Sequence, residues 1–285
     1  MLTQRTLSAA GIDAVALKPT ECDVRDALSL GVDTVVVDYE GREHLPGAAT
    51  LRALAAESTV YLTTPVRADG FDPLGDDSLA DLPEGVGRVL VAGNAAYLAD
   101  AERKRAIAPR LRAALDGIAE GAGVDPSPAP WVGTEGVERL ALAATSEPGD
   151  GSGGASSDGR AGASPVQYDL LGRTTERELR ALRTVGFEGD VAVYAPTVLT
   201  DDDDAILDAV GAYVARRRAV ARALPEGGHA DRRATGRARE VLLAAARDFA
   251  LVGTAEEVRE QVAALRAAGA TTVVCYPARG LRAFT

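Results

Sequence analysis

The amino-acid sequence predicts an α/β fold in which eight parallel strands and their helices close into one (β/α)8 TIM barrel. Short apolar runs alternate with helical patterns along the 285 residues, and this alternation is typical of parallel α/β folds. The runs are apolar on both faces, as strands covered by helices must be. A single barrel domain of roughly 250 residues also fits the length of the chain.

An open doubly wound sheet is the alternative fold. Such a sheet usually carries a Gly-x-Gly-x-x-Gly turn after its first strand, where it binds a dinucleotide. The turn at that point is Lys18-Pro19-Thr20, which has no glycine. The sequence therefore favours the barrel, with residues 1–285 as a single domain.

Each strand is predicted from a run of β-branched and other apolar residues that lies between turn-forming residues. The fifth run is the shortest and the least regular. In chain order the eight runs are Ala14–Lys18, Thr34–Asp38, Val60–Thr64, Arg88–Ala92, Trp131–Glu135, Val166–Leu171, Val191–Ala195 and Thr271–Tyr276.

The segments between the strands carry helical patterns, several with an N-terminal cap and an acidic residue three positions later. Gly269 is expected to end the last helix at a positive φ. The expected helices are one capped by Thr20 with Asp23, then Ala48–Glu57, Asp100–Glu120, Val137–Ser146, one capped by Thr175 with Glu178, Asp201–Arg222, Arg232–Arg247, and one capped by Thr254 with Glu257.

Two long connections interrupt this pattern. Pro148–Pro165 is rich in Gly and Ser and has almost no apolar residues, so we expect a disordered insert. It runs from a helix to a strand, which places it on the N-terminal face of the barrel, away from the chemistry, and makes it dispensable. The second connection, Pro65–Gly87, follows a strand and is a candidate lid, since long loops are often functional.

The charge of the chain excludes some functions. Its 42 acidic residues outnumber 31 basic ones, for a net charge of −11, and Lys18 and Lys104 are its only lysines. Such a surface stays hydrated where salt screens charge, so we expect a halophilic protein from a salt-rich cytoplasm. The acidity argues against nucleic acid as a partner, because binding to phosphates requires a basic face.

Membrane insertion, secretion and metal binding are not expected either. No apolar run approaches the roughly 18 uncharged residues of a membrane span. The start of the chain lacks the basic and apolar regions of a signal peptide, so a cytoplasmic protein is expected. Two cysteines and two histidines, none clustered, form neither a disulfide framework nor a zinc site, and a Mg²⁺ ion held by carboxylates stays open.

Polar residues at the C-terminal ends of the strands should converge at one mouth of the barrel, where barrel enzymes carry their chemistry. Lys18 ends the first strand and is a candidate amine nucleophile, proton shuttle or anion partner. It is equally a candidate for an ion pair with Asp38 or Glu40 after the second strand. Glu40 and Glu135 are candidate general acid/base carboxylates, and Asp38 completes the catalytic set.

Three residues after other strands are candidates for binding a cofactor. Arg67 and Arg279 offer guanidinium forks for phosphate or carboxylate. Arg279 follows the last strand, near the place where barrels often hold phosphate, and Gly280 beside it permits close backbone approach. Asn94, beside a glycine after the fourth strand, joins them.

The C-terminal third resembles the luciferase-like monooxygenase superfamily of flavin- and deazaflavin-dependent barrels. The residues that carry the resemblance are Leu251–Val258, the helix that follows with Gly269, and Val191–Pro196. The start, Ala-Leu-Lys-Pro-Thr-Glu at Ala16–Glu21, is similar to a branch of haloarchaeal proteins. The resemblance implies an oxidoreductase that binds FMN or the deazaflavin coenzyme. In that superfamily an acidic residue and a His usually follow the second strand together, whereas Asp38 and His44 are separated here.

Three functions remain open at this point. The first is a luciferase-like oxidoreductase that uses flavin or deazaflavin on a small organic substrate. The second is a cofactor-free lyase or aldolase-type barrel with Lys18 as the reactive amine. The third is a non-catalytic barrel descendant. The expected partner is a small-molecule substrate, and neither nucleic acid nor a membrane is expected. Self-association into a homo-oligomer is possible.

Overall fold

The structure is a computed structural model that describes residues 7, 9–66, 79, 82–91, 111–115, 118, 128–133 and 166–284. The predicted helix Val137–Ser146 and the predicted insert Pro148–Pro165 lie outside these residues. So does most of the connection Pro65–Gly87.

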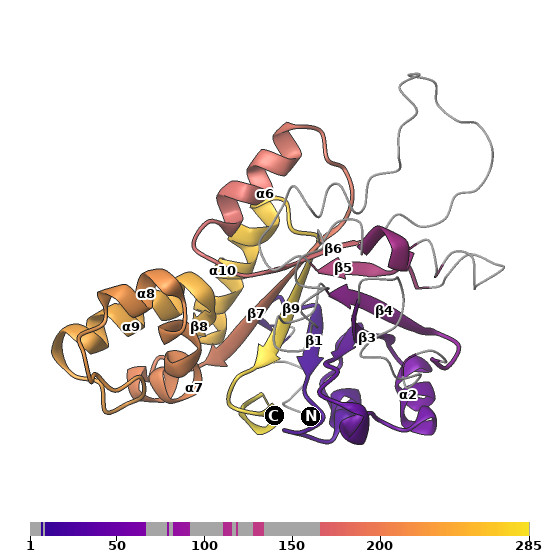
Figure 1. Ribbon diagram of the computed structural model, residues 1–285, viewed down its shortest axis with the longest axis horizontal. Helices are drawn as coiled ribbons and strands as arrows, with labels where there is room; N and C mark the ends of the chain where they lie inside the picture. Colours follow the sequence, from indigo (N-terminus) through magenta and orange to yellow (C-terminus); the bar gives the residue numbers. More distant parts are fainter. Residues whose placement is uncertain are drawn as a thin grey trace.

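Eight parallel strands form a closed barrel, as predicted (Figure 1). Neighbours in sequence pair in order from β1 to β7, and β9 lies between β7 and β1. All eight predicted runs are strands. They are β1 (Ala14–Leu17), β2 (Thr34–Val37), β3 (Thr59–Pro65), β4 (Val86–Val91), β5 (Trp131–Gly133), β6 (Val166–Leu170), β7 (Val191–Leu199) and β9 (Thr272–Pro277).

A ninth strand, β8 (Leu251–Gly253), was not predicted. It pairs with the end of β7 at Thr197–Leu199 rather than joining the barrel. Three residues are too few to show the two-residue hydrophobic alternation of a strand, and the run directly precedes a helix. The extension of β7 beyond the barrel leads the chain into a separate group of helices.

That group contains α7 (Asp203–Ala215), α8 (Arg218–Ala223) and α9 (Gly236–Phe249), which lie together beyond the end of β7 (Figure 1). The helix predicted over Asp201–Arg222 is therefore wrong as one element, because it breaks at Arg217. The Arg217 guanidinium lies 4.6 Å from the centre of the Tyr213 ring and 5.4 Å from that of Phe249. The backbone of Arg217 is extended, and this residue is the N-cap of α8.

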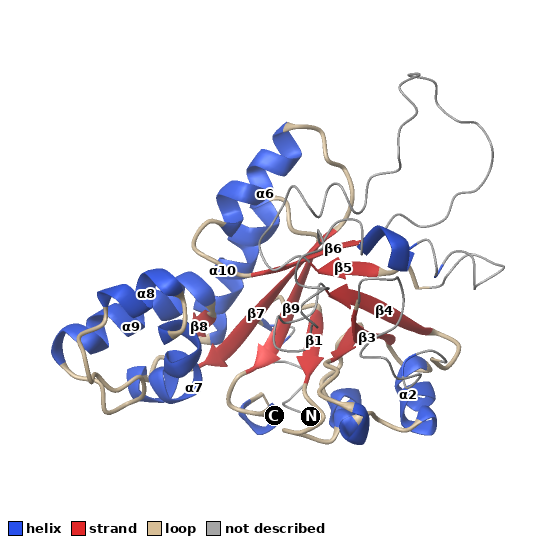
Figure 2. Cartoon of the chain, viewed as in Figure 1, coloured by secondary structure: helices blue, strands red, loops and turns tan. Residues whose placement is uncertain are grey.

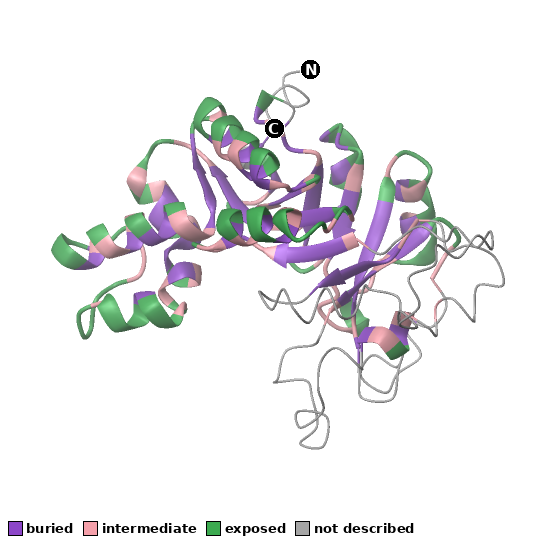
Figure 3. Cartoon of the chain, turned by 90° about the horizontal axis from the view of Figure 1, so that it is seen from above, coloured by how far each residue is buried: buried purple, intermediate pink, exposed green. Residues whose placement is uncertain are grey.

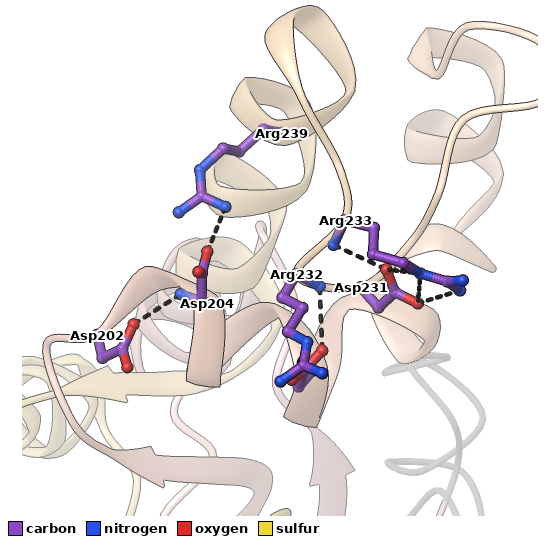
Figure 4. Close-up of polar contacts among 7 residues, drawn as sticks. Asp202, Asp204, Asp231, Arg232, Arg233 and Arg239 are labelled. Atoms are coloured by element: carbon purple, nitrogen blue, oxygen red, sulfur yellow. Dashed lines mark hydrogen bonds and ion pairs between the residues drawn. The ribbon is translucent and has the colours of Figure 1, made fainter.

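Ion pairs join α7 to the chain that follows it. Arg239 of α9 donates to Asp204 at 2.6 Å, and Asp202 accepts from the Asp204 backbone N–H as the cap of α7 (Figure 4). Arg233 pairs with Asp231 in the connection before α9. The acidic residues at the start of α7 thus interact both with the helix N-terminus, where negative charge is favourable, and with Arg239 of α9.

Two predicted caps are wrong and one is confirmed. Thr20 does not cap a helix: the next helical element is a 3-10 helix, η1 (Val24–Ser29), and Asp23 is its cap. Thr175 is already inside α6 (Thr175–Thr184), and its hydroxyl binds the Gly172 N–H instead. The capping box of Thr254 and Glu257 is present at the start of α10 (Ala255–Ala268).

The remaining helices are α2 (Ala48–Ala55), close to its predicted bounds, and the 3-10 turns η2 (Arg42–His44) and η4 (Leu281–Ala283). Helices α2, α6 and α10 pack around the barrel and expose their outer faces (Figures 2 and 3). No helix in the described parts of the chain is long and apolar enough to cross a bilayer.

The helix C-terminus of α10 is fixed by Arg183 of α6. Its guanidinium donates twice to the Gly269 carbonyl, at 2.6 and 3.2 Å, and also to the carbonyls of Phe187 and Gly189. Gly269 has the expected positive φ, of 125°. A Cβ there would lie 2.7 Å from the Arg183 side chain, so this glycine makes room for the contact as well as ending the helix.

Aromatic rings fill one side of the barrel interior. They form a continuous chain with ring centres 4.4, 5.6, 6.1 and 6.1 Å apart, and small residues such as Ala14 and Ala16 face them. An added Cβ on Gly87 would lie 2.7 Å from the first ring, so the chain of rings depends on that glycine. In order the rings are Tyr61, Trp131, Tyr168, Tyr194 and Tyr276.

Candidate active site at the barrel mouth

The C-terminal ends of the strands meet at one face of the barrel, which we call the mouth. Ala16 of β1 and Val36 of β2 are interior residues. Because side chains alternate along extended chain, Lys18 and Asp38, two positions further on, point into the mouth. The Asp38 N–H extends the strand ladder by donating to the Leu17 carbonyl at 2.8 Å.

Lys18 belongs to a polar triangle with Glu21 and Tyr276. Its ammonium donates to the Tyr276 hydroxyl at 3.1 Å and pairs with Glu21 at 3.4 Å. The Tyr276 hydroxyl in turn donates to Glu21 at 2.5 Å. The ion pair predicted for Lys18 with Asp38 or Glu40 is therefore wrong: Glu21, three residues along the loop, takes that place.

The contacts of the triangle shift the pKa values of Lys18 and Tyr276. Desolvation, the largest influence, lowers the pKa of Lys18, but the hydrogen bond and charge of Tyr276 together with Glu21 outweigh it, so the pKa of Lys18 is raised overall. Desolvation and the hydrogen bond to Glu21 raise the pKa of Tyr276 to about 12. Lys18 is thus held as an ammonium, which suits a fixed cation better than an amine nucleophile.

Asp38 is a carboxylate of the mouth with a raised pKa. It keeps part of its surface open to solvent, yet protein surrounds it closely enough for desolvation to raise its pKa to about 7. The Lys18 ammonium acts in the opposite direction, and the charges of Glu40 and Glu21 add to the rise. Within the described residues its carboxylate makes no hydrogen bond or ion pair. A carboxyl group with this pKa can both give and take a proton near neutrality.

Glu40 holds two loops together. One of its oxygens accepts hydrogen bonds from both the backbone N–H of Thr20, at 2.9 Å, and the Thr20 hydroxyl, at 2.6 Å. The loop after β1 is thereby tied to the loop after β2. This contact explains why Thr20 is not a helix cap, and it engages one of the two carboxylate oxygens of Glu40.

Arg279 lies in the turn after β9 and is exposed. Among the described residues its guanidinium has no ion-pair or hydrogen-bond partner. Gly280 follows with a φ of 75°. Glu135, Arg67 and Asn94 fall outside the described residues. His44 lies in η2, exposed and 3.8 Å from Glu43, as a surface residue.

Glu21 was not among the site residues predicted from the sequence, although it completes the triangle. The signal was present: an acidic residue three positions after one of two lysines. Among the described residues, no three or more His, Cys, Asp or Glu side chains gather in a way that could hold a metal ion.

The comparisons with known proteins bear first on the family. The model of a family of unknown function, DUF7388, matches residues 7–150 and 158–284. The chain belongs to this family. A search of curated proteins finds no match to this DUF7388 chain.

Among solved structures, the DUF7388 chain is similar to an F420-dependent secondary alcohol dehydrogenase in complex with an F420-acetone adduct. The TM-score is 0.53, with 14% sequence identity over 93% of this chain and 92% of that one. A monooxygenase, RslO1 from Streptomyces bottropensis, matches with a TM-score of 0.42 and 19% identity over 99% and 91% of the two chains. At 14% identity the first match supports the barrel fold alone.

Proposed function

We propose that the DUF7388 chain is a luciferase-like oxidoreductase that transfers a hydride between a deazaflavin or flavin coenzyme and a small organic substrate. The observation that carries the proposal is Asp38, a carboxyl group with a pKa of about 7 at the C-terminal mouth of the barrel. Hydride transfer to or from a C–O or C–N bond requires a matching proton transfer, and a group titrating near neutrality suits that task. The similarity to an F420-dependent enzyme over nearly the whole fold supports the same function.

The residues of the mouth have different roles in the proposed reaction. Asp38 takes the proton from the substrate in one direction and returns it in the other. Lys18 stays charged within its triangle with Glu21 and Tyr276 and orients a polar group of the substrate. Glu40, bound to Thr20, fixes the loop that carries Asp38.

The fit to a coenzyme rests on its phosphate end. The exposed Arg279 guanidinium, without a partner among the described residues, and the adjoining Gly280 at positive φ suit a phosphate. The coenzyme, when bound, supplies the hydride chemistry, so few protein acid/base groups are needed. Arg67, Asn94 and Glu135 stay part of the proposal because each follows a strand in the sequence.

The haloarchaeal origin suggested by the Ala16–Glu21 segment is part of this proposal. The net charge of −11 supports a haloarchaeal origin. Assays of this protein are therefore done in molar potassium chloride.

Purified protein is titrated with FMN and with the deazaflavin, each oxidised and reduced. Saturable change in coenzyme fluorescence and a rise in melting temperature are expected, because a ligand of the native state stabilises it.

Turnover is then tested with secondary alcohols and ketones, following coenzyme absorbance. Asp38→Asn should keep coenzyme binding and lower turnover by roughly 100-fold, the usual scale for loss of a proton-transfer group. Arg279→Ala should weaken coenzyme binding, whereas Arg259→Ala, an exposed arginine of α10 paired with Glu256, should not. No binding of any of the four coenzyme forms at about 100 µM, well above ordinary coenzyme affinities, would refute the proposal.

A further inference from the structure

One face of α7 carries opposite charges at its two ends. Residues four positions apart lie on the same face of a helix, and the exposed residues at this spacing are Asp204, Asp208, Ala212 and Arg216. We call these four residues the α7 ridge. Asp208 is balanced by Arg232 of its own chain, at 3.6 Å. The charge that the ridge presents to solvent therefore belongs mainly to Asp204 near its start and to Arg216 at its end.

The basic end of the ridge lacks a counter-charge among the described residues. Arg216, Arg218 and Arg222 are exposed, and within the described part of the chain none of them has an ion pair or a hydrogen bond through its guanidinium. Residues 209–225 contain no Asp or Glu. By contrast, every arginine between residues 232 and 239 pairs with a carboxylate. The unpaired arginines are thus a local feature of the end of α7 and of α8.

The acidic end still has a carboxylate oxygen to offer. Asp204 uses one oxygen to accept from Arg239 at 2.6 Å (Figure 4), and its side chain stays 57% exposed. The same guanidinium also approaches Asp203, at 3.7 Å, and Asp201 is exposed just before the helix. Several carboxylates therefore share one arginine at this end, and a second guanidinium would find an acceptor there.

A ridge with one charge of each sign is complementary to itself. In a two-fold dimer residue i of one copy meets residue j of the other, and j meets i. Two α7 helices that lie antiparallel about a point midway between Asp208 and Ala212 place Asp204 of each copy opposite Arg216 of the other. These two residues each lie about 9 Å along the helix from that point. The small side chain of Ala212 allows the two helices to approach closely there.

We propose that two copies of this chain form a symmetric dimer through the α7 ridge, held by reciprocal ion pairs between Asp204 and Arg216. The proposal goes beyond the proposed function and does not depend on ligand binding at the mouth. Each copy carries a net charge of −11, so two copies repel each other at long range. Molar salt screens this repulsion beyond roughly 3 Å, whereas partly buried ion pairs are screened much less. Association is therefore measured in molar potassium chloride.

Sedimentation equilibrium of the full chain without coenzyme provides the first test. We expect reversible dimers with a Kd that is roughly micromolar or weaker, because a helix of about 20 Å makes a small interface. A protein that stays monomeric up to about 300 µM, or roughly 5 kcal/mol of association, would overturn the proposal. The ridge would then be left for an acidic partner other than this chain.

A charge swap separates the reciprocal pairs from other modes of association. Arg216→Asp and Asp204→Arg each place like charges opposite one another at both contacts, so each variant alone should associate at least tenfold more weakly. In an equimolar mixture every contact again joins opposite charges, and dimers containing one copy of each variant should form. Dimers that persist in either variant alone, or a mixture that fails to associate, would contradict the proposal.

A second pair of variants leaves the start of α7 and its contact with Arg239 intact. Ala212→Glu adds a carboxylate at the centre of the ridge in both copies, and it also offers Arg216 a partner four residues away in its own chain. Association should weaken at least tenfold while the melting temperature of the monomer stays unchanged. Ala244→Glu, at an exposed alanine of α9, is the matched control and should associate like the unaltered protein. Equal association of these two variants would place the interface elsewhere and refute the proposal.

Discussion

The carboxylate of Glu40 accepts two hydrogen bonds from Thr20, one from its backbone N–H and one from its hydroxyl. The two residues lie on successive loops of the barrel mouth, so one side chain replaces a direct contact between the loops. The segment that carries Asp38 is thereby fixed relative to the segment that carries Lys18. Four variants test this and other contacts of the fold.

Glu40→Ala should lower the free energy of unfolding by roughly 1–2 kcal/mol, because it leaves two donors of Thr20 without their acceptor. Glu43→Ala, on the same loop, removes an exposed carboxylate whose contact is a 3.8 Å approach to His44. That control should change stability by less than about 0.5 kcal/mol. Urea denaturation measures both, and equal effects would show that the Thr20 contact is not formed in solution.

Asp38→Asn should change the pH dependence of stability. Desolvation raises the pKa of folded Asp38 to about 7, above its ordinary value, so the folded state binds the proton more tightly than the unfolded state. Asp38 therefore leaves stability unchanged at low pH and reduces it as pH rises from about 4 to 7. The isosteric amide removes this loss, which is at most about 1.4 kcal/mol for each pH unit between the ordinary pKa and the raised one.

Denaturation midpoints of the two proteins at pH 4.5 and pH 8 provide the measurement. The variant should gain most over the unaltered protein at pH 8. If the difference between them is the same at both pH values, Asp38 titrates at its ordinary pKa.

Arg183→Met should destabilise the protein by about 2–3 kcal/mol, because hydrogen bonds from a charged group to carbonyls at the C-terminus of α10 are lost. Arg180→Met, one turn earlier on α6, breaks an exposed pair with Glu176 and should cost about 0.5 kcal/mol. Thermal unfolding compares the two. Hydrogen exchange at the end of α10 should accelerate in the first variant and stay unchanged in the second.

Gly87→Ala should destabilise the barrel by roughly 1–3 kcal/mol through overpacking. The new methyl group would lie 2.7 Å from both the Tyr61 ring and the Pro128 side chain. Gly47→Ala is the matched control, since no atom lies within 4 Å of an added Cβ there. Adding Tyr61→Leu to Gly87→Ala should recover part of the loss. A fully tolerated Gly87→Ala would show that the Tyr61 ring can move aside.

Most of the barrel could be predicted because its strands are local runs of apolar residues, and local patterns are what a sequence displays. β8 could not, because three residues show no period. The caps assigned to Thr20 and Thr175 were wrong for another reason: each hydroxyl has a competing partner, Glu40 for the first and the Gly172 N–H for the second. The partner of Thr20 lies twenty residues away, where a local motif gives no sign of it.

The sequence could indicate which residue types lie in the candidate site, but not which contacts these residues make with one another. The prediction for Lys18 and Asp38 rested on their positions at the ends of the first two strands, and the structure has them directly after β1 and β2. The choice of Glu21 over Asp38 as the partner of Lys18 depends on loop geometry. The raised pKa of Asp38 depends on its desolvation in the folded barrel, which no local motif of the sequence displays.

The pairing of β1 with β9 joins Ala14 to Val274. During synthesis β1 leaves the ribosome long before β9, its final neighbour on that side. The barrel can therefore close only after β9 has been made, and until then β1 has an unpaired edge of the kind that promotes aggregation. The edge of the nascent β1 must therefore be protected until β9 has been synthesised. A cell that lacks suitable chaperones should produce this protein mainly as inclusion bodies.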